Sequence, residues 1–161
     1  MNAENGETIQ APVQPPLLHG YLKKLGDRGI KTYKRRYFRQ AGLKISYYES
    51  ENDKLDHAKG VINLEHIQEV KKSTSHQNAI ELVSRESKRT YVLQVCEPGE
   101  TVDLWMGKFG AWVKYVKDTM WQRAQVSLTP SGHSRTGEGG GSGRPGSLRM
   151  TSDLLKLSSY T

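Results

Sequence analysis

The stretch GYLKKLGDRGIKTYKRRYFR, residues 20–39, predicts a β-hairpin and sets the fold class of the chain. Its two arms, residues 20–25 and 31–39, are rich in aromatic and aliphatic side chains. They flank GDRG (residues 26–29), a Gly/Asp combination typical of a turn between two strands.

The basic side chains nearest this turn are in phase with the apolar ones. Every second side chain of a strand lies on the same face, so Leu22 shares a face with Lys24, and Phe38 shares one with Lys34 and Arg36. If Leu22 and Phe38 point to the core, the three cations line a concave basic pocket beside the turn. Buried unpaired charge is costly, and a multiply phosphorylated group would satisfy all three cations.

A plainer interpretation is a solvated edge strand, because Lys and Arg discourage pairing at sheet edges. That interpretation accounts for Arg35 and Arg39. It accounts less well for Lys24, Lys34 and Arg36, which are in phase.

The positive charge of the chain is concentrated in this hairpin. Between His19 and Arg39 there are eight Lys or Arg and one acid, a net +7, which equals the net charge of all 161 residues. The remainder holds sixteen bases and sixteen acids (24 − 8 and 17 − 1). One compact basic element attracts an anionic partner, so an anionic membrane, an acidic protein and nucleic acid are the candidate partners.

Period-two patterns predict five further strands and then one helix. The strands are expected at residues 43–49, 60–64, 66–70, 79–84 and 89–95. In residues 101–120, Trp105, Phe109, Trp112 and Val116 recur at helical spacing and form one apolar face, which we interpret as core packing rather than a ligand cage. The pattern predicts a mostly β fold, an antiparallel sandwich or partly open barrel of seven strands capped by one C-terminal α-helix.

Composition divides the chain into three parts. Residues 1–17 are polar and contain proline, which predicts a disordered leader, and residues 18–124 are expected to form the domain. Residues 125–161 are expected to be a flexible Gly/Ser-rich tail, with a short helix near 151–158 that could bind a protein partner.

Several function classes are disfavoured by the residue content. Cys96 is the single cysteine, so no intrachain disulfide can form, and a reducing compartment is expected. The five histidines show no metal-ligand spacing with each other or with Cys96. The glycine run lacks the Lys-Ser/Thr of a phosphate loop, and no nucleophilic triad is recognisable. We therefore expect no enzyme activity, no metal and no cofactor.

The segments GYLKKLGDRGIKTYKRRYF, ISYYES, KGVINL and YVLQV, with the Trp-bearing helix after them, resemble a pleckstrin-homology (PH) domain of the phosphoinositide-binding type. The resemblance covers roughly residues 19–121. The family's phosphoinositide signature is a first-strand Lys, a variable loop, and then a basic residue, any residue and Arg. Lys24, Lys34 and Arg36 match it.

The resemblance also implies a role for individual residues. Lys24, Lys34 and Arg36 would bind a 3-phosphate and its neighbouring phosphate. Lys31, Tyr47 and Lys59 match positions typical of members that recognise 3-phosphorylated inositides; the first two would assist, and Lys59 would lie near the 5-phosphate. The supporting residues would be Arg28 and Arg35.

These features predict a cytoplasmic adaptor that is reversibly recruited to the inner face of the plasma membrane in signalling. Its ligand would be the 3,4,5-trisphosphate or 3,4-bisphosphate form of a phosphoinositide. The alternative is a protein-interaction module of the same fold that binds an acidic or phosphorylated peptide. Nucleic-acid binding ranks third and is not expected, because the charge is compact rather than a long stripe.

Overall fold

The computed structural model describes residues 10–29 and 31–128. The chain divides into two units, residues 1–129 and 130–161, and the described residues all belong to the first. The short helix predicted near 151–158 lies outside the described residues.

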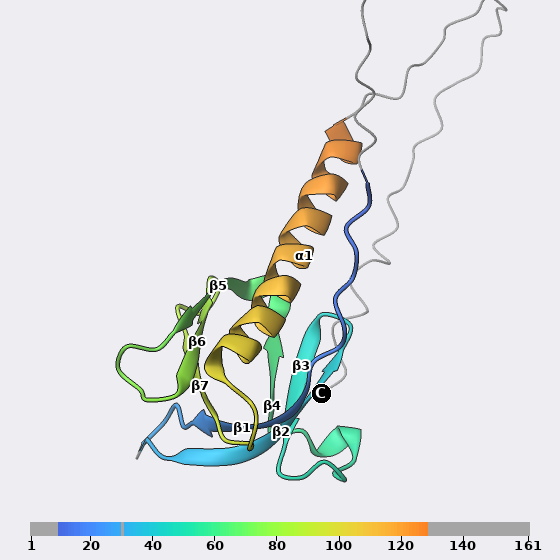
Figure 1. The fold of residues 1–161 in the computed structure, drawn as a ribbon. Coiled ribbons are helices and arrows are strands. Elements are labelled where there is room, and N and C mark those ends of the chain that lie inside the picture. Colours follow the sequence, from blue (N-terminus) through green and yellow to red (C-terminus); the bar gives the residue numbers. More distant parts are fainter. Residues whose placement is uncertain (1–9, 30, 129–161) are drawn as a thin grey trace, which may run out of the picture. The chain divides into compact units, whose positions relative to one another are not determined.

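Seven antiparallel strands form one sheet in the order β4-β3-β2-β1-β7-β6-β5 (Figure 1). The strands are β1 His19–Leu25, β2 Tyr33–Ala41, β3 Lys44–Tyr48, β4 Gly60–Asn63, β5 Ile67–Lys72, β6 Ala79–Ser84 and β7 Thr90–Val95. The edges of this sheet are β4 and β5, which the short 3₁₀-helix η2 (Leu64–His66) connects along the chain. A second 3₁₀-helix, η1 (Leu55–His57), lies between β3 and β4. The predicted mostly β fold of seven antiparallel strands and one C-terminal helix is confirmed.

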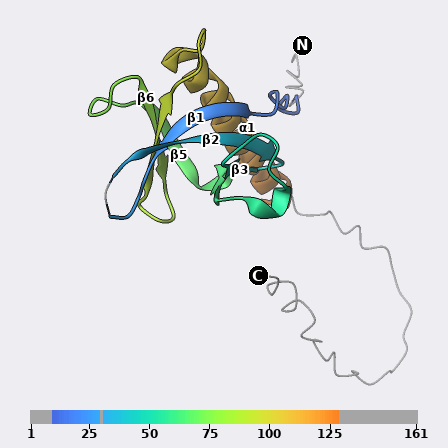
Figure 2. The same ribbon diagram turned by 90° about the horizontal axis from the view of Figure 1, so that it is seen from below.

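The predicted hairpin is formed by β1 and β2, and the turn between them projects from one end of the sheet (Figure 2). Leu22 and Phe38 are fully buried, as the alternation predicts. The solvated-edge interpretation is wrong, because β2 pairs with β1 on one side and with β3 on the other. The charge of the hairpin therefore lies on interior strands.

The helix α1, Val102–Leu128, packs on η2 and on strands β5, β6 and β7. Its predicted apolar face is buried: Trp105, Phe109, Trp112 and Val116 are each at most 4% exposed. The Trp105 ring also meets β1 at Gly20, where an added Cβ would lie 3.1 Å from Cζ2 of the indole. Gly20 has a φ of +141°, which side chains rarely adopt, so glycine fits this close approach. Core packing explains the tryptophan stripe.

The observed limits of the domain differ from the predicted ones at both ends. Residues 10–17, expected in the leader, run alongside α1 (Figure 1). The Pro16 carbonyl accepts a hydrogen bond of 2.8 Å from the indole N–H of Trp112. At the other end α1 continues to Leu128, four residues beyond the expected boundary at Ala124. A periodic apolar pattern arises only where one face of a helix is buried against the sheet. The last turns of α1 are exposed and lack such a pattern, so the sequence did not predict them.

The two kinds of tryptophan on α1 give a test of the packing. We expect Trp105→Ala to lower the free energy of unfolding by about 3–5 kcal/mol, because it leaves a large cavity between α1 and the sheet. Trp121→Ala is the matched control: Trp121 is 58% exposed, and its loss should change stability by no more than about 0.5 kcal/mol. Urea unfolding followed by far-UV circular dichroism measures both, and equal effects would contradict this account of α1.

Candidate functional site

Cationic side chains from several elements gather around the β1–β2 turn. We call this set the cationic cluster. Lys24 lies on β1, two members lie in the turn, two on β2, one before β4 and one before β7. Its members are Lys24, Arg28, Lys31, Lys34, Arg36, Lys59 and Arg89.

Lys24 is the buried member of the cluster, with 7% of the residue exposed. Its ammonium donates to the Leu25 carbonyl at 3.2 Å and to Oδ2 of Asp27 at 3.0 Å. It also lies 5.4 Å from the ring centroid of Tyr47. Burial lowers the pKa of Lys24, and the charges of Arg89 and Arg36 lower it further.

Lys34 and Arg36 share the face of Lys24. Lys24 lies directly opposite Lys34 in the β1–β2 register, and Leu22 lies opposite Arg36. Like charges in directly opposed positions destabilise a sheet. Among the residues that the structure describes, neither Lys34 nor Arg36 forms an ion pair with a carboxylate. Lys24, Lys34 and Arg36 therefore lie on one face, as predicted, and their positive charge is not fully compensated by carboxylates of the protein.

Tyr47 and Lys59 join the cluster from the β3 side. Tyr47 lies opposite Gly60 in the β3–β4 register, and its hydroxyl crosses that residue so closely that an added Cβ would lie 2.2 Å from Oη. Burial is the main cause of the raised pKa of the Tyr47 hydroxyl. The Lys59 ammonium lies 3.5 Å from the Glu49 carboxylate. The backbone N–H of Lys59 donates to the Tyr47 carbonyl at 2.8 Å, and this hydrogen bond positions the Lys59 backbone beside β3.

Two cavities lie within the cluster. The larger, about 710 Å³, is lined by Asp27, Arg28, Tyr47, Lys59, Gly60, Val61, Ser87 and Arg89. The smaller, about 300 Å³, is lined by Leu25, Gly26, Asp27, Lys31, His76, Arg89, Thr90 and Val92. Of the predicted site residues, Arg28, Tyr47 and Lys59 line the larger cavity and Lys31 lines the smaller. The expectation that Lys24, Lys34 and Arg36 line a pocket is not met at these two cavities, because neither lining includes them.

Two residues that line both cavities were not predicted as site residues. Arg89 pairs with the Asp27 carboxylate, and its guanidinium lies 4.6 Å from the ring centroid of Tyr91. No motif of the sequence marks Arg89, because it comes from a distant loop. Asp27 is conspicuous in the sequence, because it is the single acid among eight basic residues between His19 and Arg39.

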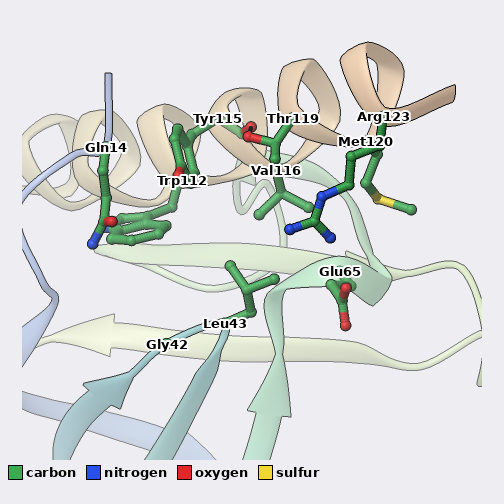
Figure 3. A pocket seen from close by; sticks show the side chains of 10 residues that line it. All are labelled: Gln14, Gly42, Leu43, Glu65, Trp112, Tyr115, Val116, Thr119, Met120 and Arg123. Carbon is green, nitrogen blue, oxygen red and sulfur yellow. Dashed lines mark hydrogen bonds between the residues drawn. The ribbon is translucent and has the colours of Figure 1, made fainter. Parts of the chain in front are cut away.

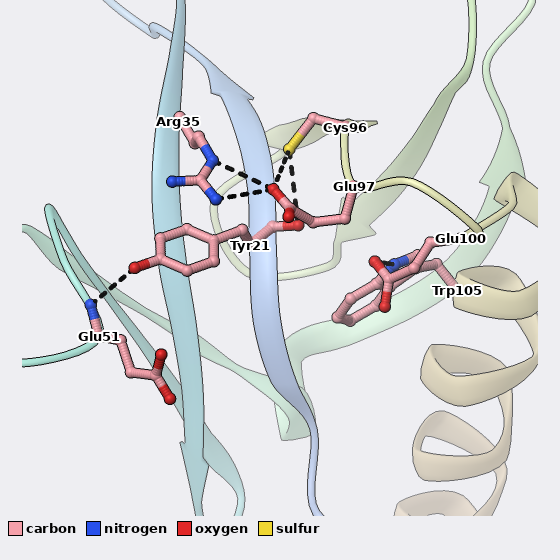
Figure 4. A network of polar contacts seen from close by, with 7 residues as sticks. All are labelled: Tyr21, Arg35, Glu51, Cys96, Glu97, Glu100 and Trp105. Atoms are coloured by element: carbon pink, nitrogen blue, oxygen red, sulfur yellow. Dashed lines mark hydrogen bonds and ion pairs between the residues drawn. The ribbon is translucent and has the colours of Figure 1, made fainter.

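Arg35 lies on the opposite face of β2, away from the cluster. Its guanidinium stacks 3.5 Å from the ring centroid of Tyr21 and donates twice to Glu97, at 3.1 and 2.8 Å (Figure 4). The hydrogen bond from Arg35 lowers the pKa of the Glu97 carboxyl. Cys96 is beside this pair, and burial raises the pKa of its thiol. The structure therefore does not bring Arg35 together with the other predicted residues.

A third cavity, about 230 Å³, lies between α1 and the turn that joins β2 to β3 (Figure 3). Apolar and aromatic side chains from α1, among them Trp112 and Val116, face Leu43 across it. It holds one cation, Arg123, and one anion, Glu65. This balanced, mainly apolar lining does not suit a polyanion, so the cationic cluster is the candidate site.

The described residues contain neither a membrane-spanning helix nor a cluster of metal ligands. No helix in residues 10–29 and 31–128 combines the length and the hydropathy needed to cross a membrane. Within the same residues, no group of three His, Cys, Asp or Glu side chains is arranged to hold a metal ion.

Residues 16–111 match the family model of the PH domain, which is more than half of the chain. The chain belongs to the PH domain family. This agrees with the seven-stranded sheet, the C-terminal helix and the resemblance found in the sequence.

The chain is also similar to other PH domain proteins. It is 40% identical over 88 residues to a PH domain-containing protein of Dictyostelium discoideum, a match that covers 54% of this chain and 10% of that relative's length. It resembles the solved PH domain of human pleckstrin homology domain-containing family A member 5, at 23% identity and a TM-score of 0.49, covering 70% of this chain and 89% of that one. The C-terminal PH domain of pleckstrin, solved in complex with an inositol pentakisphosphate, gives 23% identity and a TM-score of 0.44 and covers 65% and 96% of the two chains.

The contact between Tyr47 and Gly60 can be tested by adding one methyl group. We expect Gly60→Ala to destabilise the domain by about 1–3 kcal/mol, because the methyl displaces the Tyr47 hydroxyl and ring from the wall of the larger cavity. Gly107→Ala adds the same group in open space on α1 and should stabilise the protein by about 0.5–1 kcal/mol. Thermal unfolding of both variants is the measurement, and a Gly60→Ala variant as stable as wild type would show that Tyr47 does not depend on this glycine.

Proposed function

We propose that this PH domain binds the head group of a phosphoinositide and so recruits the protein to a membrane. The observation that supports it most is the face shared by Lys24, Lys34 and Arg36, two of which have no carboxylate partner among the described residues. Charge-assisted hydrogen bonds to phosphate oxygens would satisfy these cations and relieve their mutual repulsion. The proposal includes no catalytic activity.

The proposed ligand is a 3-phosphorylated inositide, the 3,4,5-trisphosphate or 3,4-bisphosphate form. Lys24, Lys34 and Arg36 would bind the 3-phosphate and its neighbour, and Lys31 and Tyr47 would assist. Lys59 would lie near the 5-phosphate. Two contacts support this assignment: Tyr47 and Lys59 line the larger cavity beside Arg28, and the Lys24 ammonium lies 5.4 Å from the ring centroid of Tyr47.

Attraction of the basic face to other anionic lipids would add to specific binding. Each Lys or Arg near an anionic leaflet contributes about 1 kcal/mol, so the exposed members of the cluster would favour the inner face of the plasma membrane. Head-group binding would then select membranes that carry the phosphoinositide.

The test is binding of the full chain to vesicles of equal net charge at physiological salt. The vesicles carry the 3,4,5-trisphosphate, the 3,4-bisphosphate, the 4,5-bisphosphate or additional phosphatidylserine. We expect preference for a 3-phosphorylated lipid and a loss of at least about tenfold in affinity for Lys34→Ala/Arg36→Ala, because two charge-assisted contacts disappear.

The pair Arg35→Ala/Arg39→Ala is the matched control, because it removes the same charge from the opposite face of β2. This pair should reduce binding to all vesicles alike and by a smaller factor. Equal binding across the panel, with both double variants equally weakened, would refute head-group recognition. An acidic or phosphorylated peptide would then be the ligand to examine.

A further inference from the structure

Asp27 brings one carboxylate into the cationic cluster. Its Oδ2 atom accepts a hydrogen bond of 3.0 Å from the Lys24 ammonium and also pairs with the Arg89 guanidinium. A single carboxylate oxygen therefore joins a cation of β1 to a cation immediately before β7. Asp27 is about one third exposed, so this bridge lies at the surface of the site rather than in the core.

The Asp27–Arg89 pair also forms the boundary between the two cavities of the site. Both residues line the cavity of about 710 Å³ and the cavity of about 300 Å³. Arg28 and Lys59 line the first cavity only, and Lys31 lines the second only. A ligand bound between Asp27 and Arg89 would therefore lie beside the cations of both cavities.

The two cations that Asp27 joins differ in burial and in hydrogen bonding. The Lys24 side chain is 8% exposed, so its ammonium requires a counter-ion or must lose its charge. Arg89 has an unpaired hydrogen-bond donor, because its Nε atom is buried and has no partner among the described residues. Both needs would be met by an anion with more charge and more acceptor atoms than a carboxylate.

We propose that Asp27 competes internally with the ligand, and that a phosphate of the ligand replaces its carboxylate at Lys24 and Arg89. Arg89 is then a further ligand-binding residue, and Asp27 sets the affinity of the site. This inference rests on the proposed function, since it concerns the same site.

Replacement of Asp27 favours highly charged ligands. A carboxylate carries one negative charge, whereas a phosphomonoester carries about 1.5 to 2 and offers three acceptor oxygens. A phosphomonoester gains electrostatic energy when it takes the place of Asp27. A singly charged lipid such as phosphatidylserine gains little by the exchange, so its binding depends on the exposed basic face rather than on the place that Asp27 occupies.

The variant Asp27→Asn tests the competition in the full chain. Without ligand, it should melt at a lower temperature than wild type, because Lys24, Arg36 and Arg89 then repel one another without compensation. On vesicles that carry the 3-phosphorylated lipid it should bind about fivefold more tightly, the effect of removing one partly exposed ion pair. On vesicles with phosphatidylserine alone the gain should be small.

Asp118→Asn is the matched control. Asp118 pairs with Lys114 on α1, so this variant makes the same change of charge in an ion pair outside the cluster. Its binding should rise equally and slightly on both kinds of vesicle. Arg89→Gln should weaken binding to the 3-phosphorylated lipid by about tenfold, because it removes a charged ligand contact.

The outcomes separate this inference from the proposed function. If wild type selects phosphoinositides but Asp27→Asn binds no more tightly than Asp118→Asn, the competition is refuted and the proposed function stands. If wild type shows no lipid selectivity, inorganic pyrophosphate is the probe. A larger pyrophosphate-induced rise in melting temperature for Asp27→Asn than for wild type then supports the competition, and an equal rise refutes it.

Discussion

The packing of α1 against η2, β5, β6 and β7 is the constraint on which the rest of the structure depends. Trp105, Phe109 and Trp112 fill this part of the core with almost no exposure. Each indole N–H has a partner, Glu100 Oε2 at 2.7 Å for Trp105 and the Pro16 carbonyl at 2.8 Å for Trp112. Both rings can therefore be buried without the cost of an unsatisfied donor. Gly107 and Gly110 weaken the helix in isolation, so packing must supply its stability.

The candidate site is a continuation of this core. Along β1 and β2 the face that buries Leu22 and Phe38 also carries Lys24, Lys34 and Arg36 toward the turn. Because strand pairing holds the backbone, the cations cannot move apart to reduce their repulsion, although flexible side chains relieve part of it. The stability of the core thus sustains a local excess of positive charge that an anion can use.

The two faces of the hairpin differ in how their charges are compensated. On the outer face Arg35 is neutralised by Glu97 and stacks on Tyr21, so its charge is satisfied within the protein. On the inner face Lys34 and Arg36 form no ion pair among the described residues, and Asp27 alone joins Lys24 to Arg89. Not every basic residue of the hairpin is therefore available to a ligand. Because side chains alternate between the two faces of a strand, the sequence indicates which residues lie on the inner face.

Local pattern alone predicted the seven strands, a turn after Leu25, the tryptophan face of the helix and the face shared by Lys24, Lys34 and Arg36, because each depends on a local repeat or on turn-forming residues. Tertiary structure alone decided what depends on distant contacts. Arg89 reaches Asp27 across 62 positions of sequence, and Tyr47 passes over Gly60 because β3 pairs with β4. The same holds for residues 10–17 beside α1, since a polar, proline-containing segment carries no periodic signal of its own. Periodicity records which face a residue lies on, whereas folding decides which other residues meet it there.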